Sequence, residues 1–82
     1  MKTVLITGAS SGTGKAAVKY FQARGWNVAA TMRKPEDEKE LTSLNNVHCF
    51  KLDVENVNSI QDAIKDTIKQ FGGIDVVVNN AG

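Results

Sequence analysis

Apolar and polar positions along this chain follow two different patterns, which alternate from one end of the chain to the other. Short runs rich in β-branched and other apolar residues, typical of buried strands, lie at 4–7, 27–32, 47–52 and 74–79. Between the third and fourth runs, apolar residues recur every three or four positions, as on one face of a helix: Val57, Ile60, Ile64, Ile68 and Phe71. The pattern therefore predicts strands and helices in alternation.

Two further helices are expected between the first three strands. Residues 13–24 have helical spacing, with Tyr20 expected on the apolar face that packs on the core. Pro35 suits the first turn of a short helix because its fixed φ is already helical. Leu41 and Leu44 would form the buried side of that short helix.

This alternation predicts an α/β fold, half of a Rossmann-type doubly wound parallel sheet. We expect four strands in the order 3-2-1-4 and three helices, with right-handed crossovers that cover both faces of the sheet. The first and fourth strands then flank the point where the winding reverses. Ligands bind at that point in sheets of this kind.

The composition argues against several classes of partner. The net charge is +1, so no strong field favours nucleic acid or a membrane surface. No segment approaches the ~20 apolar residues of a membrane-spanning helix. Cys49 is the single cysteine and excludes an internal disulfide, so we expect a cytoplasmic protein. His48 is the single histidine, and no cluster of acids and cysteines with metal-ligand spacing surrounds it, so no metal site is expected.

The glycine-rich segment from Thr7 to Gly14 carries the most chemical information. It lies between the first predicted strand and the first predicted helix. Glycines allow a tight turn and let a ligand approach the backbone without meeting a Cβ. The start of the helix offers unpaired N–H groups and a positive dipole end to an anion. The segment therefore predicts a site that holds phosphate.

Three motifs, each at the end of a predicted strand, together resemble the short-chain dehydrogenase/reductase family. The turn matches that family's Thr-Gly-x-x-x-Gly-x-Gly, Asp53 follows the third strand, and Asn79-Asn80-Ala81-Gly82 follows the fourth. The resemblance covers the whole chain but only the N-terminal half of the family. It implies that residues 1–82 form one NAD(P)-binding half-domain, truncated before the catalytic segment.

The resemblance also implies which residues bind the cofactor. Its phosphates would be held by the glycine-rich turn, at Gly8, Ser10, Ser11, Gly12, Thr13 and Gly14. Asp53 would hydrogen-bond the adenine amino group, with Val54 packing nearby. The adenosine ribose would lie along Asn80, Ala81 and Gly82. The family most often has Ile at the position of Thr13, so an apolar contact to the cofactor is lost in this chain.

The end of the second strand favours NADP over NAD. A ribose 2′-OH is usually bound by an acid at this point, whereas a 2′-phosphate needs positive charge. This chain has Arg33 and Lys34 there and no acid before Glu36. An arginine can give a phosphate two parallel charge-assisted bonds, so we expect Arg33 to be the main contact, assisted by Lys34 or Ser10. The alternative is that both cations are loop charges in water.

The resemblance implies hydride transfer between the dinucleotide and a carbonyl or alcohol. The family's catalytic Ser and Tyr-x-x-x-Lys lie beyond its Asn-Asn-Ala-Gly motif, so no catalytic residue is expected among these 82 residues. Tyr20 and Arg24 have the Tyr-x-x-x-Lys spacing, but an arginine cannot relay a proton at neutral pH. The isolated chain is therefore expected to catalyse nothing.

Two other functions remain open. The chain could be a non-catalytic nucleotide-binding module, or an excised or designed half-fold, which would share the same turn and sheet. It could also be an ATP-binding phosphate-loop fragment, since Gly14-Lys15-Ala16 approaches that motif. Ala16, however, lacks the hydroxyl that holds magnesium in phosphate loops.

The fourth strand has a further consequence for partners. The run Val76-Val77-Val78 has no charged residue and would form an open edge of the sheet. Unpaired strand edges are templates for pairing with another chain. A homodimer through this edge, or aggregation, is therefore expected, alongside the dinucleotide as the small-molecule partner.

Overall fold

The computed structural model describes residues 1–80. Its strands and helices follow one another as β1 (Thr3–Ile6), α1 (Gly12–Ala23), β2 (Asn27–Met32), β3 (Val47–Lys51), α2 (Val57–Phe71) and β4 (Val76–Val78). Two short 3-10 helices, η1 (Pro35–Asp37) and η2 (Leu41–Ser43), lie between β2 and β3. Neither α-helix in this part of the chain is long and apolar enough to span a bilayer.

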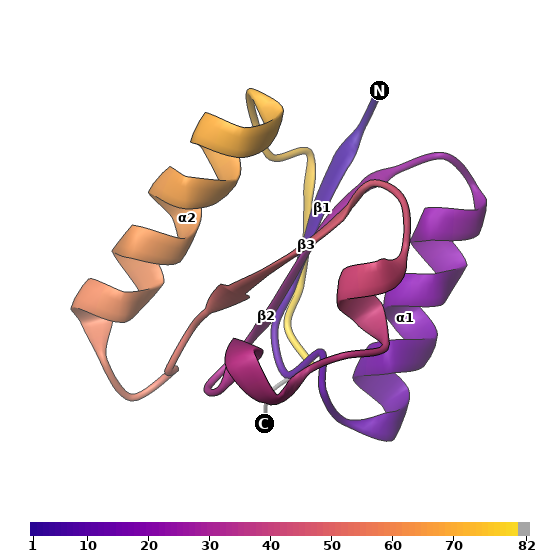
Figure 1. The fold of residues 1–82 in the computed structure, drawn as a ribbon. Helices are drawn as coiled ribbons and strands as arrows, with labels where there is room; N and C mark the ends of the chain where they lie inside the picture. Colours follow the sequence, from indigo (N-terminus) through magenta and orange to yellow (C-terminus); the bar gives the residue numbers. More distant parts are fainter. Residues whose placement is uncertain (81–82) are drawn as a thin grey trace.

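The four strands form one parallel sheet in the order β3-β2-β1-β4, which confirms the predicted order. Leu5 of β1 aligns with Ala29 of β2 and with Val77 of β4. Figure 1 shows α1 and α2 on opposite faces of the sheet. The structure is therefore the expected half of a Rossmann-type α/β fold.

The expected third helix is replaced by the two 3-10 turns. Pro35 does start a helical turn, but it ends at Glu38, whose backbone is extended (φ −90°, ψ 115°). The Glu38 side chain is buried, and its carboxylate accepts a hydrogen bond of 2.9 Å from the Leu41 backbone N–H. A side-chain acceptor at this point caps a second short turn, so one continuous helix does not form.

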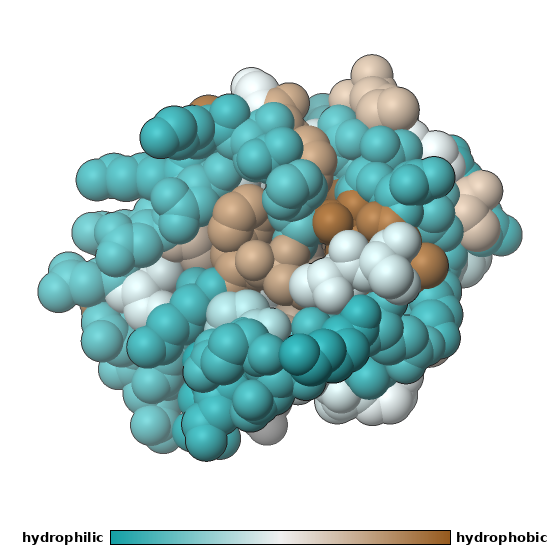
Figure 2. Space-filling model, in the orientation of Figure 1, coloured by the Kyte–Doolittle hydropathy of each residue, from teal (hydrophilic) through white to brown (hydrophobic). Residues whose placement is uncertain are grey.

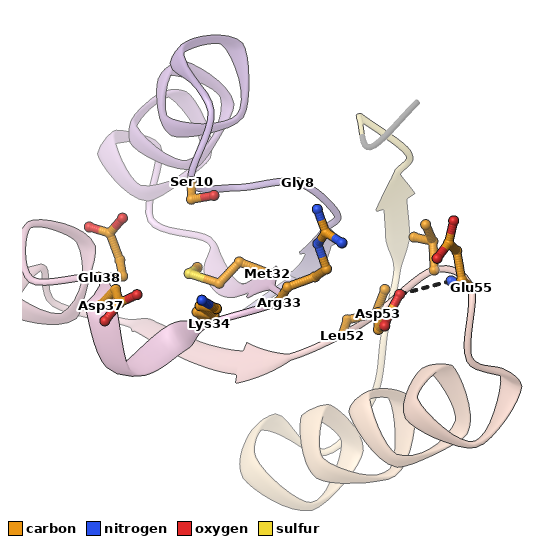
Figure 3. A pocket seen from close by; sticks show the side chains of 11 residues that line it. Gly8, Ser10, Met32, Arg33, Lys34, Asp37, Glu38, Leu52, Asp53 and Glu55 are labelled. Carbon is orange, nitrogen blue, oxygen red and sulfur yellow. Dashed lines mark hydrogen bonds between the residues drawn. The ribbon is translucent and has the colours of Figure 1, made fainter.

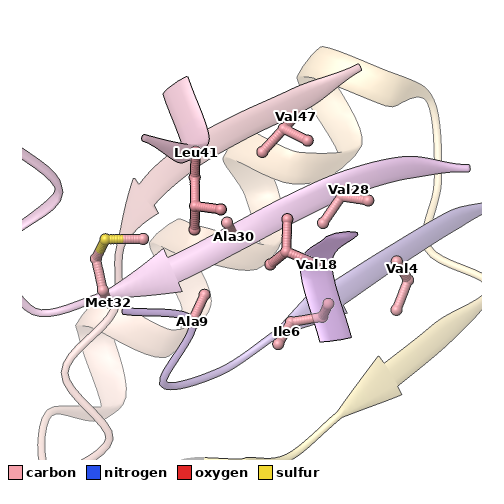
Figure 4. Packing of buried hydrophobic residues seen from close by; sticks show 9 residues of the cluster. All are labelled: Val4, Ile6, Ala9, Val18, Val28, Ala30, Met32, Leu41 and Val47. Carbon is pink, nitrogen blue, oxygen red and sulfur yellow. The ribbon is translucent and has the colours of Figure 1, made fainter. Parts of the chain in front are cut away.

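Alternate residues of the central strands point to the two faces of the sheet and form two apolar cores. On the α1 face, the cluster consists of Val4, Ile6, Ala9, Val18, Val28, Ala30, Met32, Leu41 and Val47, as Figure 4 shows. On the α2 face, the cluster is smaller and consists of Leu5, Ala29, Leu52 and Ala63. Burial of each valine-sized side chain contributes about 1.5–3 kcal/mol, so the α1 face carries most of the apolar stabilisation.

The expectation that Tyr20 faces the core is wrong. Tyr20 is 54% exposed, and the buried positions of α1 are Gly14 and Val18. The Arg24 guanidinium lies 3.6 Å from the centre of the Tyr20 ring, a cation–π contact on the helix surface. The reason is the rotation of α1, which is fixed by the packing of Gly14 on the turn rather than by the largest apolar side chain.

Polar side chains cover the outer sides of the two helices. On the face shown in Figure 2, hydrophilic residues form the periphery, and apolar atoms reach the surface mainly near the middle. The apolar face of α2 is only partly buried, because Val57, Ile64 and Ile68 are 68%, 40% and 46% exposed. Apolar surface thus remains uncovered on the α2 side of the sheet.

Candidate functional site

A cavity of about 870 Å³ opens at the carboxyl ends of β1, β2 and β3, where ligands bind in parallel sheets. Its wall comes from the glycine-rich turn, the end of β2 with η1, and the segment after β3. The lining residues are Gly8, Ser10, Met32, Arg33, Lys34, Asp37, Glu38, Leu52, Asp53, Val54 and Glu55, shown in Figure 3. Six of the residues predicted from sequence are among them: Gly8, Ser10, Arg33, Lys34, Asp53 and Val54.

The turn is held in shape by its own hydrogen bonds. Gly8 has φ 62°, the left-handed conformation that glycine adopts without strain. Ser11 is the N-cap of α1: its Oγ accepts from the Gly14 N–H (3.2 Å) and donates to the Gly8 carbonyl (2.9 Å). The Ala9 N–H donates to the Thr31 carbonyl (3.0 Å), which ties the turn to β2. The helix accordingly begins at Gly12, one residue earlier than the sequence predicted.

Gly12 and Gly14 have different roles in this geometry. A Cβ on Gly14 would stand 2.1 Å from the Gly8 carbonyl oxygen, so glycine is required for α1 to pack on the turn. A Cβ on Gly12 would have no neighbour within 4 Å. The N–H groups of Gly12 and Thr13, in the first turn of α1, make no backbone hydrogen bond within residues 1–80. They remain available to an anion.

Arg33 lies in the middle of the pocket. In Figure 3 its guanidinium points toward the backbone of Gly8, and Asp53 lies on its other side. Within residues 1–80, Arg33 and Lys34 make no side-chain hydrogen bond or ion pair, and both are exposed. Of the acids in the wall, Asp37 and Glu38 lie at the far end from Asp53 and Glu55. The guanidinium is therefore free to bind an anion.

Lys15, the next residue after the turn, has its charge engaged elsewhere. Its Nζ lies 3.4 Å from Glu38 Oε1 and 3.4 Å from Glu40 Oε1. The hydrogen bond that the Lys15 ammonium donates to Glu38 raises the pKa of Lys15 above its ordinary value, so the ammonium stays charged and paired. A phosphate loop needs this lysine at the phosphates. The observed pairing argues against the phosphate-loop alternative.

Asp53 is held between β3 and α2. Its backbone N–H donates to Ser59 Oγ (2.9 Å), and its Oδ1 accepts from the Glu55 N–H (3.0 Å). Within the described part of the chain, Oδ2 makes no hydrogen bond and can accept one from a ligand. Val54 beside it is 50% exposed and offers an apolar surface to the pocket.

The other predicted residues lie beside the pocket or outside the described structure. Asn80 follows β4 and contacts the turn, and Ser11, Gly12, Thr13 and Gly14 form the start of α1, but none of these lines the cavity. Ala81 and Gly82 lie outside the described residues. Sequence reasoning did not assign Met32 and Leu52 to the wall. Their positions at the ends of β2 and β3 were the available signal.

The remaining reactive side chains form no second site in the described chain. Among residues 1–80, no three His, Cys, Asp or Glu side chains gather as metal ligands. His48 packs against the rings of Phe50 and Phe71, at 6.1 and 5.6 Å between ring centres. Burial raises the pKa of the Cys49 thiol, which makes its thiolate scarcer.

The chain is similar to known proteins over its full length. The family model described as short chain dehydrogenase matches residues 2–82. An uncharacterized oxidoreductase of Schizosaccharomyces pombe is 45% identical over 98% of this chain and 27% of its own length. An NADP-dependent 3-hydroxy acid dehydrogenase of Shigella flexneri is 37% identical over 96% of this chain and 33% of its own.

The fold comparison agrees with the sequence comparison. A crystal structure of a short-chain dehydrogenase from Streptomyces avermitilis matches with a TM-score of 0.90 and 36% identity, over all of this chain and 32% of that one. The chain thus spans about a third of the length of the curated relatives it matches. The match of fold, turn and family model leads to one conclusion: this chain belongs to the short-chain dehydrogenase family.

Proposed function

We propose that this chain binds NADP(H), with the adenosine half of the dinucleotide in the cavity at the carboxyl ends of β1, β2 and β3. The observation that carries the proposal is Arg33, an unpaired guanidinium in the middle of that cavity. Its fork of donors suits the 2′-phosphate, and no acid occupies the end of β2 to bind a 2′-OH instead. Lys34 and Ser10 line the same wall and would assist.

The other parts of the dinucleotide follow from this placement. The free N–H groups of Gly12 and Thr13 face an anion such as the pyrophosphate. Asp53 Oδ2 accepts from the adenine amino group, and Val54 packs on the adenine ring. Asn80, Ala81 and Gly82 follow the ribose. Within the family, the bound nicotinamide supplies the hydride chemistry, and the protein supplies binding and orientation.

We propose that the whole protein is an oxidoreductase acting on a carbonyl or alcohol and that residues 1–82 alone do not catalyse this reaction. The names of the relatives, which include an oxidoreductase and a dehydrogenase, support the first part. Tyr20 is the single tyrosine, and it forms a surface cation–π pair with Arg24, which supports the second part. Nicotinamide absorbance in the presence of a panel of carbonyls tests it: oxidation of NADPH by the chain would contradict it.

Titration of the chain with NADPH, NADH and ATP–magnesium tests the binding proposal. We expect NADPH to bind more tightly than NADH and ATP–magnesium not to compete. Arg33→Asp should weaken the binding of NADPH by about 10- to 100-fold, the equivalent of one charge-assisted interaction. It should weaken the binding of NADH by less than about threefold. Lys65→Asp, the same kind of charge change on the exposed side of α2, is the control and should leave both affinities unchanged.

Two results would contradict the cofactor assignment in different ways. Equal losses for NADPH and NADH in Arg33→Asp would mean that Arg33 does not bind the 2′-phosphate. Tight ATP–magnesium binding without any NADPH response would favour a nucleoside triphosphate as the ligand.

We also propose that copies of the chain associate through β4. This strand is hydrogen-bonded to β1 on one side, and Val76 and Val77 are 38% and 60% exposed. Two-fold symmetry would place two β4 strands antiparallel, joining the two sheets. An apolar groove of about 370 Å³, lined in part by Val77, Ile60 and Ile64, adds apolar area next to this edge.

Sedimentation velocity over a range of concentrations tests the association. The chain should form dimers as concentration rises, and Val77→Lys should keep it monomeric. Val57→Lys places the same charge on an exposed valine of α2, away from β4, and should still dimerise. A parent chain that remains monomeric at high concentration would contradict the proposal.

A further inference from the structure

Asn80 connects the end of β4 to the glycine-rich turn. Its backbone N–H donates to Thr7 Oγ1 (2.9 Å), and its Nδ2 donates to the Gly8 carbonyl (3.2 Å) and to Ser11 Oγ (3.0 Å). These partners lie about 70 positions earlier, at 73, 72 and 69 residues' separation. The Asn80 side chain therefore bridges Gly8 and Ser11 within the turn.

The direction of the Asn80 carboxamide is determined by its partners. The Gly8 carbonyl can only accept, so Nδ2 must face it, and Oδ1 then points the other way. Thr13 Oγ1 donates to this Oδ1 at 3.0 Å. Thr13 thus completes the set of hydrogen bonds around the carboxamide, from the first turn of α1. An apolar side chain at position 13 could not donate to Oδ1.

We propose that Thr13 is a positioning residue: through Asn80, its hydroxyl holds the glycine-rich turn in the shape that binds the dinucleotide's pyrophosphate. The inference rests on the proposed function, because it assigns the turn to that ligand. Glycine-rich segments lose more conformational entropy than others when they become ordered. A turn already ordered by the Thr13–Asn80–Ser11 hydrogen bonds loses less on binding, and affinity rises accordingly.

The hydroxyl also separates two functions of one residue. The Thr13 backbone N–H makes no backbone hydrogen bond within residues 1–80 and is left for the ligand, while its side chain bonds to Asn80. Replacing the hydroxyl with a methyl group removes only the second function. Thr13→Val does this at nearly constant shape, and Thr13→Ser keeps the hydroxyl.

Two measurements on the free and liganded chain test the proposal. The first is backbone hydrogen exchange of residues 8–14 in the free chain, with the side-chain amide resonances of Asn80 in an NMR spectrum. The second is NADPH affinity. We expect Thr13→Val to accelerate backbone hydrogen exchange in the turn. It should also weaken the binding of NADPH about three- to tenfold, the effect of one neutral hydrogen bond. Thr13→Ser should stay within about twofold of the parent in both.

Thr42→Val is the matched control, since Thr42 lies on η2, outside the turn, and its Oγ1 donates to the Lys39 carbonyl (2.9 Å). It should change neither measurement. Unchanged exchange in Thr13→Val would overturn the proposal, and so would accelerated exchange with unchanged NADPH affinity. If the parent chain does not bind NADPH, the proposed function fails, and the exchange measurement still decides whether Thr13 orders the turn.

Discussion

The Cα of Gly14 faces the carbonyl oxygen of Gly8 so closely that a Cβ built on Gly14 would stand 2.1 Å from that oxygen and 2.7 Å from the Ala9 Cα. All of these are backbone atoms, so no change of rotamer can make room. The close approach of Gly14 to Gly8 therefore determines both the packing of α1 on the sheet and the shape of the glycine-rich turn. A substitution at Gly14 changes both at once.

Gly14→Ala should lower the free energy of unfolding by about 2–4 kcal/mol, because the helix and the turn must move apart. Gly12→Ala is the control, since a Cβ there meets nothing within 4 Å. Alanine at this helical position should leave stability unchanged or raise it by about 0.5–1 kcal/mol. Urea denaturation followed by circular dichroism measures both. Equal stability of the two variants would show that the turn and α1 do not pack as described.

Glu38 is a buried acid that connects α1 to η2. Its Oε2 accepts from the Leu41 N–H at 2.9 Å, and its Oε1 lies 3.4 Å from the Lys15 ammonium. Glu38→Ala should reduce stability by about 1–3 kcal/mol, since the buried Leu41 N–H loses its acceptor. Glu38→Gln keeps an acceptor and should recover part of the loss. Glu36→Ala, at an exposed position of η1, should be neutral in the same denaturation experiment.

The pair formed by Glu40 and Lys19 should make stability depend on pH at the acid end. The hydrogen bond from Lys19 holds the pKa of Glu40 below its ordinary value of 4.5. A carboxyl whose pKa is lower in the folded state than in the unfolded state stabilises the fold at pH values above its unfolded-state pKa. This stabilisation is lost as the pH falls through the folded-state pKa. In thermal melting experiments, the melting temperature of Glu40→Gln should therefore decrease less on acidification than that of the parent chain.

Two conditions check this reading of the Glu40–Lys19 pair. The difference between Glu40→Gln and the parent should shrink in high salt, because both side chains are half-exposed. It should also vanish well below pH 4.5, where the parent carboxyl is protonated. A difference that persists at low pH would point to a role other than charge.

Asp75 joins the start of β4 to the start of β1. Its Oδ2 accepts from the Thr3 N–H (2.8 Å), and its own N–H donates to the Thr3 carbonyl (2.8 Å). Asp75→Ala should cost about 0.5–1.5 kcal/mol and speed hydrogen exchange at the Thr3 amide. Asp75→Asn keeps the acceptor and should lose less. Asp62→Ala, on the exposed side of α2, provides the comparison; an equal effect there would contradict a specific role for Asp75.

The strands and their order could be predicted because each is encoded locally. The runs around Leu5 and Val77 are apolar at successive positions, as is typical of strands in a parallel sheet, and the intervening helical spacing forces crossover connections. The glycine-rich turn, with Gly8 in the left-handed region, is likewise a property of neighbouring residues. Six of the predicted site residues line one cavity because the carboxyl ends of parallel strands meet at one edge.

Contacts between distant segments decided the rest. The spacing of α1 could not show that Val18 rather than Tyr20 is buried, because the rotation of the helix depends on Gly14 meeting Gly8. No local pattern pairs Lys15 with Glu38. The Glu38 carboxylate also accepts from the Leu41 N–H, at the point where two 3-10 turns replace the expected third helix. The sequence by itself determined which segments become strands and helices, since hydrophobic spacing acts over a few residues. Which polar groups pair, and so which stay free for a ligand, was decided only when the folded chain brought distant donors and acceptors within hydrogen-bond distance.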